Sequence, residues 1–189
     1  NLQTAVKAAN KEKAHAQIAL CYTLGDAYTL DYWKDIAKRI EDMGADSICI
    51  KDMANLLLPL HAYDLVRKLK DSVSVPIHLH THNTAGTGDM VNLMACQAGV
   101  DIVDCALSPL ANGTSQPATE SLVATLQGSD RDTGLDLAKL NEAAKELYDV
   151  DNFADMIADE TICTEDPEEL LNYLTEVGHP VLSMEPFDM

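Results

Sequence analysis

Three histidines alternate along one short apolar segment, residues 76–83 (PIHLHTHN). If this segment is a strand, His78, His80 and His82 point to the same face, because successive strand side chains alternate between the two faces. Neutral imidazoles at positions i and i+2 of one face can share a divalent metal ion. The pattern therefore predicts a metal site. The alternative is a polar strand end whose histidines form ordinary hydrogen bonds.

A lysine, Lys51, ends a second apolar segment, residues 47–53 (SICIKDM). A charged ammonium that faces a barrel interior carries a large desolvation cost, and this cost favours the neutral amine. A neutral buried lysine is a nucleophile or a site of modification. The alternative is a lysine whose ammonium reaches the rim of the sheet or pairs with Asp52.

Repeated strand and helix patterns must position these residues. Apolar, strand-like segments recur about 25–30 residues apart, and a helical pattern separates each pair. The predicted strands are 16–22, 46–51, 75–81 and 101–107, and the predicted helices are 31–43, 59–69 and 88–98. Thr29 is the expected N-cap of the first helix, and Gly44 and Gly99 are expected helix stops. In such βα repeats ligands collect at the carboxyl ends of the strands, where Lys51, His80 and His82 lie.

The length of 189 residues, 47% of them hydrophobic, suffices for one core. It is too short for a complete eight-unit barrel of about 250 residues. We therefore expect a partial TIM-type (β/α)8 barrel of about four βα units over residues 1–147. No apolar run of about 18 residues and no leader pattern occurs, so we expect neither a membrane span nor a secretory signal.

The net charge of −18 argues against a nucleic-acid or anionic-membrane partner, since both require a basic patch. Twelve acidic residues and no Lys or Arg fall in residues 148–189, which we interpret as an acidic, partly helical tail of unknown role with a helix over 166–178.

Five widely spaced cysteines favour reduced thiols and a cytoplasmic location.

Three motifs in this order resemble the carboxyltransferase domain of the pyruvate carboxylase, oxaloacetate decarboxylase and transcarboxylase family. They are residues 47–54 (SICIKDMA), 76–86 (PIHLHTHNTAG) and 113–120 (GTSQPATE). Residues 22–24 (YTL) and 29–32 (TLDY) agree with the segment that precedes the lysine strand in that family. The resemblance covers roughly residues 1–147.

The resemblance implies a barrel whose zinc, manganese or cobalt ion is held by an aspartate, a carbamylated lysine and two histidines. These map to Lys51, which is also the catalytic position, His80 and His82. The aspartate and the family's substrate-binding arginine have no match, because the resemblance places the opening of this sequence just before the fifth barrel strand. The implied reaction moves a carboxyl group between carboxybiotin and pyruvate or oxaloacetate, through an enolate that the metal stabilises.

The loop over residues 106–120 is rich in Gly, Pro and Ser and is expected at the barrel mouth. Thr114, Ser115 and Gln116 are candidates for contact with substrate or biotin. The alternative is a turn followed by a helix that Thr119 or Ser121 caps. Many relatives carry Asp at the position of Asn83, where an amide can still orient a histidine.

The implied partners are a biotin carboxyl carrier domain with a biotin carboxylase or membrane decarboxylase subunits. A half-barrel has two exposed edge strands, so we also expect an oligomer or complementation by another chain. Two other functions stay open. One is a metal-dependent aldol- or Claisen-type acyl-CoA lyase or synthase. We expect that class not to use a carbamylated lysine as a ligand. The other is a non-catalytic fragment.

Overall fold

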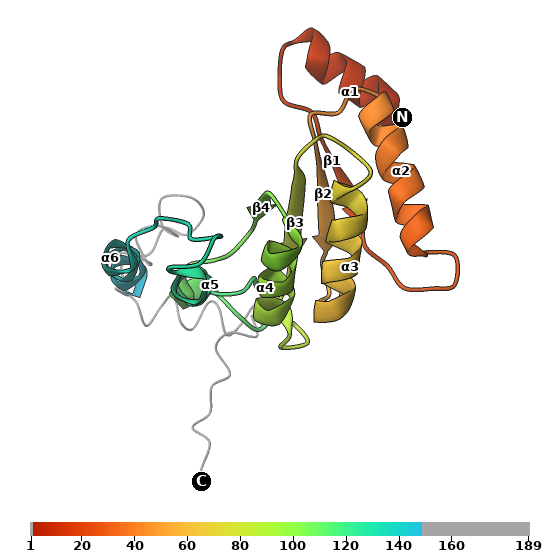
Figure 1. Ribbon diagram of the computed structural model, residues 1–189. Coiled ribbons are helices and arrows are strands. Elements are labelled where there is room, and N and C mark those ends of the chain that lie inside the picture. Colours follow the sequence, from red (N-terminus) through yellow and green to blue (C-terminus); the bar gives the residue numbers. More distant parts are fainter. Residues whose placement is uncertain (1, 149–189) are drawn as a thin grey trace, which may run out of the picture. The chain divides into compact units, whose positions relative to one another are not determined.

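The computed structural model describes residues 2–148 (Figure 1). Residues up to Leu137 form one compact unit, and helix α6 (Leu137–Tyr148) leads into a second unit. The predicted helix over 166–178 and Cys163 lie outside the described residues. Within the described part of the chain, no helix is long and apolar enough to cross a membrane.

Four parallel strands form one sheet in the order β1-β2-β3-β4, as they occur in the sequence. They are β1 (Gln17–Cys21), β2 (Ser47–Asp52), β3 (Ile77–Thr81) and β4 (Ile102–Val103). A doubly wound sheet reverses its strand order at a switch point, and this sheet does not. The order is that of a barrel segment, so the predicted partial barrel is confirmed.

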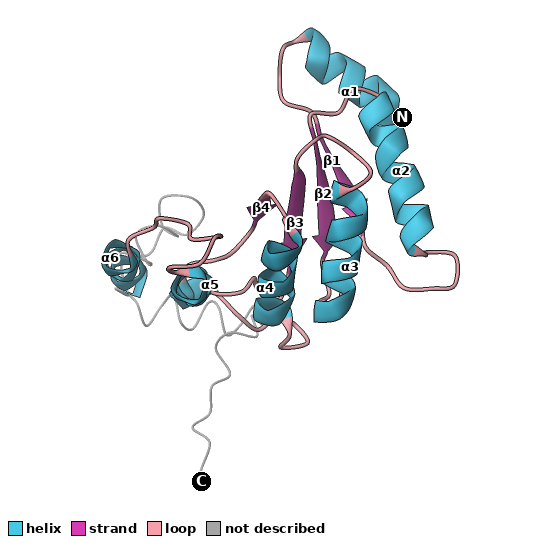
Figure 2. Cartoon of the chain, in the orientation of Figure 1, coloured by secondary structure: helices cyan, strands magenta, loops and turns pink. Residues whose placement is uncertain are grey.

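Helices follow the strands closely as predicted. They are α2 (Leu30–Asp42), α3 (Pro59–Lys70), α4 (Gly88–Ala98) and α5 (Thr119–Leu126), with α1 (Leu2–Lys11) before the sheet. Thr29 caps α2, since its Oγ1 accepts a hydrogen bond of 3.2 Å from the backbone N–H of Tyr32. Gly99 ends α4 with φ of 96°. Helices α2, α3 and α4 lie along one face of the sheet, and the long loops meet at the carboxyl ends of the strands (Figure 2).

The two faces of the sheet differ in burial. The helix-facing side chains form the core and include Ile18, Leu20, Ile48, Ile50, Ile77 and Leu79. On the opposite face Gln17, Ala19 and Cys21 of β1 are exposed, while His78 and His80 of β3 are half-buried. The core therefore fills one face, and the second face presents the polar side chains.

The fourth strand is much shorter than predicted. Asp104 N still donates to Leu79 O at 3.0 Å, which keeps the chain beside β3. Beyond it Ala106 pairs with the segment before α5 instead, through the bonds Ala106 N to Pro117 O and Thr119 N to Ala106 O, of 3.0 and 2.8 Å. A short 3-10 helix (Ser108–Leu110) follows that turn. The prediction of a strand over 101–107 is wrong because this second pairing draws the chain away.

The start of α5 also differs from the prediction. Its N-cap is Ala118, and no side chain caps it. The alternative in which Thr119 or Ser121 caps this helix is therefore wrong. Glu120 instead bonds with the loop, accepting from Ser108 N at 3.1 Å.

Candidate active site

Lys51 and His80 are partners in the pairing of β2 with β3, so their side chains lie on the same face at one level. Lys51 is half-buried, and its amine makes no hydrogen bond or ion pair with any residue from 2 to 148. Asp52 points to the opposite face, where its buried carboxylate accepts from Leu56 N and Leu57 N at 2.9 Å each. Pairing of Lys51 with Asp52 is therefore wrong.

The side chains of His80 and His82 converge on one point. Their Nε2 atoms are 3.4 Å apart. His80 Nδ1 lies 2.7 Å from Asp104 Oδ2, and His82 Nδ1 lies 2.6 Å from Thr114 O. Carboxylate and carbonyl oxygens accept hydrogen bonds, so each Nδ1 carries the hydrogen and each neutral ring leaves a lone pair on Nε2.

His78 shares the face, as predicted, but lies one level below this pair. Its Nε2 is 2.8 Å from Asp104 Oδ1, a close but poorly directed contact, and its Nδ1 is 3.3 Å from Gln17 Oε1. Partial burial would raise the pKa of Asp104, but the bonds from His80 and His78 outweigh it and lower this pKa below its usual value. Asp104 therefore joins two of the three histidines.

Two imidazole lone pairs beside a lysine fit part of a metal site. Two Nε2 atoms on one side of an ion are an arrangement that zinc, manganese and cobalt accept. Among residues 2–148 no group of three or more His, Cys, Asp or Glu side chains is placed to hold a metal. Among these residues the two histidines therefore provide only part of a coordination shell.

The loop before α5 reaches the histidines mainly through its backbone. Thr114 contributes its carbonyl to His82, and Ser115 O accepts from Asn83 N at 2.8 Å. Gln116 is the member of the predicted trio whose side chain reaches the site, with its Nε2 3.1 Å from His80 Nδ1. The structure thus brings this loop to the histidines, and the side chain of Thr114 stays exposed.

Asn83 does not orient a histidine, so that expectation is wrong. Its Nδ2 donates to Asp89 Oδ2 at 3.1 Å and to Asn112 Oδ1 at 2.8 Å, and its Oδ1 accepts from Gly88 N at 2.8 Å. These bonds hold the turn into α4 against the loop before α5. Asn83 therefore fixes the backbone from which His82 extends.

Asn55 provides a second link between loops. It adopts the left-handed conformation with φ of 54°, and its Oδ1 accepts from Ala85 N and Thr87 N at 3.1 and 3.2 Å. This ties the loop that follows Lys51 to the loop that follows His82. The sequence analysis missed Asn55, because its partners lie about thirty positions away and no local pattern marks them.

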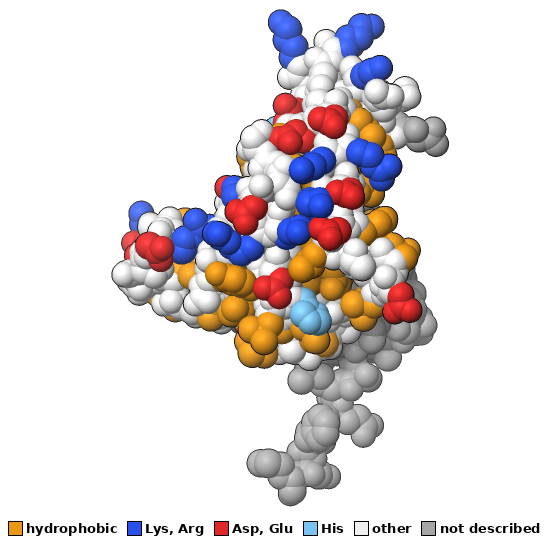
Figure 3. Space-filling model, turned by 45° about the vertical axis from the view of Figure 1, so that its right-hand side comes forward, with side chains coloured by type: hydrophobic (Ala, Val, Ile, Leu, Met, Phe, Trp, Pro, Cys, Tyr) orange, Lys and Arg blue, Asp and Glu red, His pale blue; other side chains and the backbone are white. Residues whose placement is uncertain are grey.

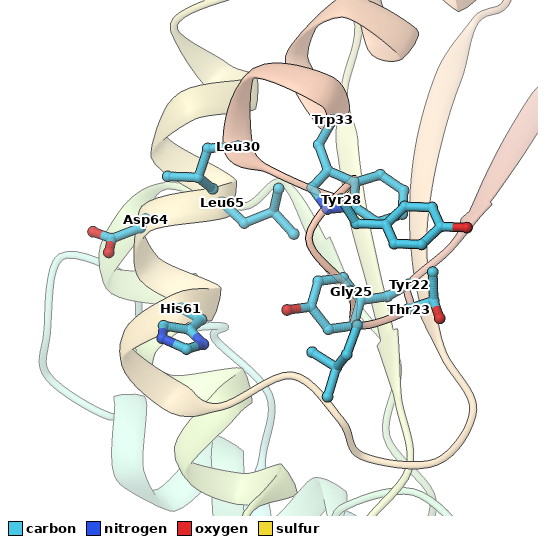
Figure 4. Close-up of a pocket in the computed structure, with 10 residues that line it drawn as sticks. Tyr22, Thr23, Gly25, Tyr28, Leu30, Trp33, His61, Asp64 and Leu65 are labelled. Atoms are coloured by element: carbon cyan, nitrogen blue, oxygen red, sulfur yellow. The ribbon is translucent and has the colours of Figure 1, made fainter.

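The end of the unit at which α3 begins carries many hydrophobic side chains, whereas acidic and basic side chains intermingle over the helices (Figure 3). Exposed apolar residues in the loops and helix starts there are Leu24, Met53, Leu56, Leu58, Leu60 and Met90. A cavity of about 350 Å³ opens at the same end, between α3 and the loop after β1 (Figure 4).

Aromatic rings form one wall of this cavity. Tyr22 stacks on Trp33 with ring centroids 5.7 Å apart, and Tyr28 stacks on Trp33 at 5.9 Å. Burial, with a contribution from the Asp52 carboxylate, raises the pKa of Tyr22. Lys51 and the histidine pair do not line the cavity, so it is separate from the predicted metal site.

Asp104 and the Thr114 carbonyl are the site groups that the sequence analysis missed. Asp104 follows Ile102 by two positions, so strand alternation in the predicted fourth strand would have placed it on the histidine face. The Thr114 carbonyl has no such signal, since every residue carries the same backbone oxygen.

Comparison with known protein families gives two matches along this chain. A sequence model described as HMGL-like matches residues 1–147, and one described as the C-terminal part of the ACS/CODH beta subunit matches residues 135–188. The chain is 53% identical over 142 residues to a pyruvate carboxylase subunit of Methanocaldococcus jannaschii, covering 75% of this chain and 25% of that protein. It is 39% identical over 144 residues to the methylmalonyl-CoA carboxyltransferase 5S subunit of Propionibacterium freudenreichii, covering 75% and 28%.

Solved structures of carboxyl transferase domains also match this chain. The carboxyl transferase domain of Rhizobium etli pyruvate carboxylase, determined with pyruvate and biocytin, matches with a TM-score of 0.76 and 38% identity. The match covers 79% of this chain and 26% of that one. The chain thus spans about a quarter of the length of these relatives.

Proposed function

This chain belongs to the HMGL-like family, and on that premise we propose that it is a portion of a biotin-dependent carboxyltransferase. The reaction would move a carboxyl group between carboxybiotin and pyruvate or oxaloacetate. The named relatives support this choice, because they are pyruvate carboxylases and a methylmalonyl-CoA carboxyltransferase. The complete activity belongs to a longer assembly, since this chain matches about a quarter of each relative.

The convergence of His80 Nε2 and His82 Nε2 at 3.4 Å, with Lys51 level with His80, is the observation that carries the proposal. We assign these three residues as ligands of a divalent zinc, manganese or cobalt ion. Such an ion supplies Lewis-acid polarisation next to the pyruvate oxygens, where negative charge develops in the enolate.

Lys51 suits carbamylation, which makes it the catalytic position. Its amine lies beside the histidine pair and makes no bond to another described residue. The neutral amine attacks carbon dioxide, a nitrogen–carbon bond forms, and the nitrogen releases a proton to solvent. The product is an anionic oxygen ligand in place of a half-buried cation.

The loop carrying Thr114, Ser115 and Gln116 is assigned to the substrate or biotin side of the site. Support comes from the Gln116 amide beside His80 and from the Thr114 carbonyl that holds His82. An exposed Thr114 side chain leaves its hydroxyl available to a ligand. Thr114→Ala should therefore leave metal binding unchanged while it weakens binding of pyruvate or free biotin in the assembled enzyme.

The partners that follow are a biotin carboxyl carrier domain and a biotin carboxylase or membrane decarboxylase subunits, with biotin as the carried cosubstrate. We assign the assembly to the cytoplasm and expect an oligomer, because the edge of β1 is unpaired among the described residues. Residues 1–147 form the barrel portion and residues 148–189 a separate tail. The first family match ends at residue 147, and the second begins at residue 135 and so overlaps it.

The test is elemental analysis of the full 189-residue chain with intact-mass measurement in bicarbonate. We expect bound metal and a mass increment of one carbon dioxide, both lost in Lys51→Ala, and metal lost in His80→Ala. His61→Ala, which removes an exposed histidine of α3, is the matched control and should retain both.

Other outcomes identify the alternatives. Metal retained by Lys51→Ala but lost from His80→Ala would favour an acyl-CoA lyase or synthase that uses the histidines alone. Absence of both metal and increment in the parent chain would leave a non-catalytic fragment and contradict the proposal.

A further inference from the structure

We propose that Asp104 is a positioning residue that selects the metal-competent tautomer of His80. The inference rests on the proposed metal site and adds a residue that neither the sequence motifs nor the comparisons assign. It follows from the two side chains that reach the same ring nitrogen of His80.

His80 Nδ1 has two neighbours of opposite character. Asp104 Oδ2, at 2.7 Å, is an acceptor, so it places the imidazole hydrogen on Nδ1. Gln116 Nε2 is a donor that lies 3.1 Å from Nδ1 and 3.3 Å from Nε2, so it can bond whichever ring nitrogen carries no hydrogen. Asp104 accepts a hydrogen at Nδ1 alone, and this shorter, charge-assisted contact determines the tautomer.

The tautomer decides whether the histidine pair is open to a metal. With the hydrogen on Nδ1, His80 Nε2 and His82 Nε2 both present lone pairs 3.4 Å apart, an arrangement that favours a shared cation. With the hydrogen on Nε2, His80 would donate to His82 instead, and the pair would close on itself. Asp104 thus keeps the pair open.

The backbone holds Asp104 at the correct level. Asp104 N donates to Leu79 O at 3.0 Å, next to His80, and Asn92 Nδ2 donates to Asp104 O at 3.4 Å. The second carboxylate oxygen lies 2.8 Å from His78 Nε2, in the poorly directed contact described above. The backbone bonds therefore hold position 104 level with His80, as a residue that orients a ligand requires.

His82 is an internal control in the same molecule. Its Nδ1 bonds to the Thr114 carbonyl at 2.6 Å, so no change at position 104 removes its acceptor. Loss of Asp104 should therefore alter the tautomer of His80 and leave that of His82 as it was. A general loss of folding would change both.

The experiment compares the full chain with Asp104→Ala and Asp104→Asn by long-range proton–nitrogen NMR of the imidazoles in metal-free protein at pH about 8.5, where an ordinary imidazole is neutral. We expect the His80 hydrogen on Nδ1 in the parent and on Nε2 in Asp104→Ala. Asp104→Asn keeps an acceptor oxygen and should restore Nδ1. Asp101→Ala, which removes the other carboxylate next to β4, is the matched control, because that carboxylate bonds Lys70 and Ile77 N and not a histidine.

Titration with Zn²⁺ or Co²⁺ supplies the second readout. We expect Asp104→Ala to weaken metal binding about 10–100-fold, the range for loss of such a supporting contact. A parent chain with the His80 hydrogen on Nε2, or an Asp104→Ala chain with it still on Nδ1, would overturn the inference. The tautomer is measured without metal, so absence of metal binding by the parent would count against the proposed function and not against the role of Asp104.

Discussion

Asn83 Nδ2 donates a 3.1 Å hydrogen bond to Asp89 Oδ2, and this bond joins the end of the histidine strand to the first turn of α4. The bond requires an amide, because an ionised carboxylate at position 83 has no hydrogen to donate. It also places the Asn83 oxygen toward Gly88 N, so the side chain has a single useful orientation.

Asn83→Asp should destabilise the unit by about 1–3 kcal/mol, since two partly buried hydrogen bonds from Nδ2 are lost and two carboxylates face each other. Urea unfolding of the parent and the variant measures the change in free energy. Adding Asp89→Asn to Asn83→Asp should recover part of the loss, whereas Asp89→Asn alone should not stabilise the parent. Strict additivity of the two substitutions would show that the residues do not interact.

Gly88→Ala should disturb both stability and His82. A Cβ at Gly88 would lie 2.9 Å from His82 O, Asn83 Oδ1 and Pro117 Cγ. We expect a loss of about 1–3 kcal/mol and weaker metal binding, because His82 must move with its backbone. Gly86→Ala is the control. It has open space but φ of 74°, so it should cost about 1–2 kcal/mol through backbone strain and leave metal affinity unchanged. Equal metal affinity in both variants would contradict this prediction.

Asp52→Asn should destabilise the turn that follows Lys51. The Asp52 carboxylate accepts from Leu56 N, Leu57 N and Thr81 Oγ1, at 2.9, 2.9 and 3.2 Å, and is fully buried. An amide retains one oxygen and turns an NH₂ group toward these donors, at a cost of about 1–3 kcal/mol. Exposed Asp26 offers the comparison, since Asp26→Asn should change stability by less than about 0.5 kcal/mol. Chemical denaturation measures the free energy of unfolding of both variants. Equal effects of the two substitutions would contradict the prediction.

The Cys105 thiol should make stability fall at alkaline pH. Burial raises its pKa to about 12, with the Asn92 contact acting in the opposite direction. In the unfolded chain a thiol ionises near pH 8.5, so between that pH and about 12 the folded state retains a proton that the unfolded state has released. Stability is then complete below pH about 8.5 and declines as pH rises.

The measurement is the free energy of unfolding from pH 7 to 10 for the parent, Cys105→Ala and the exposed Cys21→Ala. Cys105→Ala should show a shallower decline than the other two. Identical slopes in all three proteins would mean that the Cys105 thiol does not titrate differently in the two states.

Local sequence patterns predicted the regular elements well. The apolar spacing around Trp33 and Ile40, with the Thr29 cap, gave α2 to within about a residue, because these signals act within a few positions of one another. The alternation of His78 and His80 with buried Leu79 likewise gave the orientation of β3. The length of β4 was not predictable in this way, because it depends on Ala106 pairing with the segment before α5.

Residues of the candidate site were predictable from the sequence where the type of side chain itself indicates metal binding. Residues that act through distant contacts were not. Lys51, His80 and His82 stand out by residue type and strand position. The contribution of Asn55 depends on backbone amides of a distant loop, and that of Asp104 depends on the register of β4 with β3. Helix α1 was missed because it lies before the repeating βα pattern from which the other helices were predicted.

The two histidines differ in how readily mutation can tune them. A single codon change at Asp104 can remove the acceptor of His80 Nδ1, and evolution can sample it directly. His82 depends on a peptide oxygen, which survives every substitution at Thr114 and can be withdrawn only by remodelling the loop. Variation among natural or engineered sequences should therefore adjust the metal site through His80, while His82 stays constant.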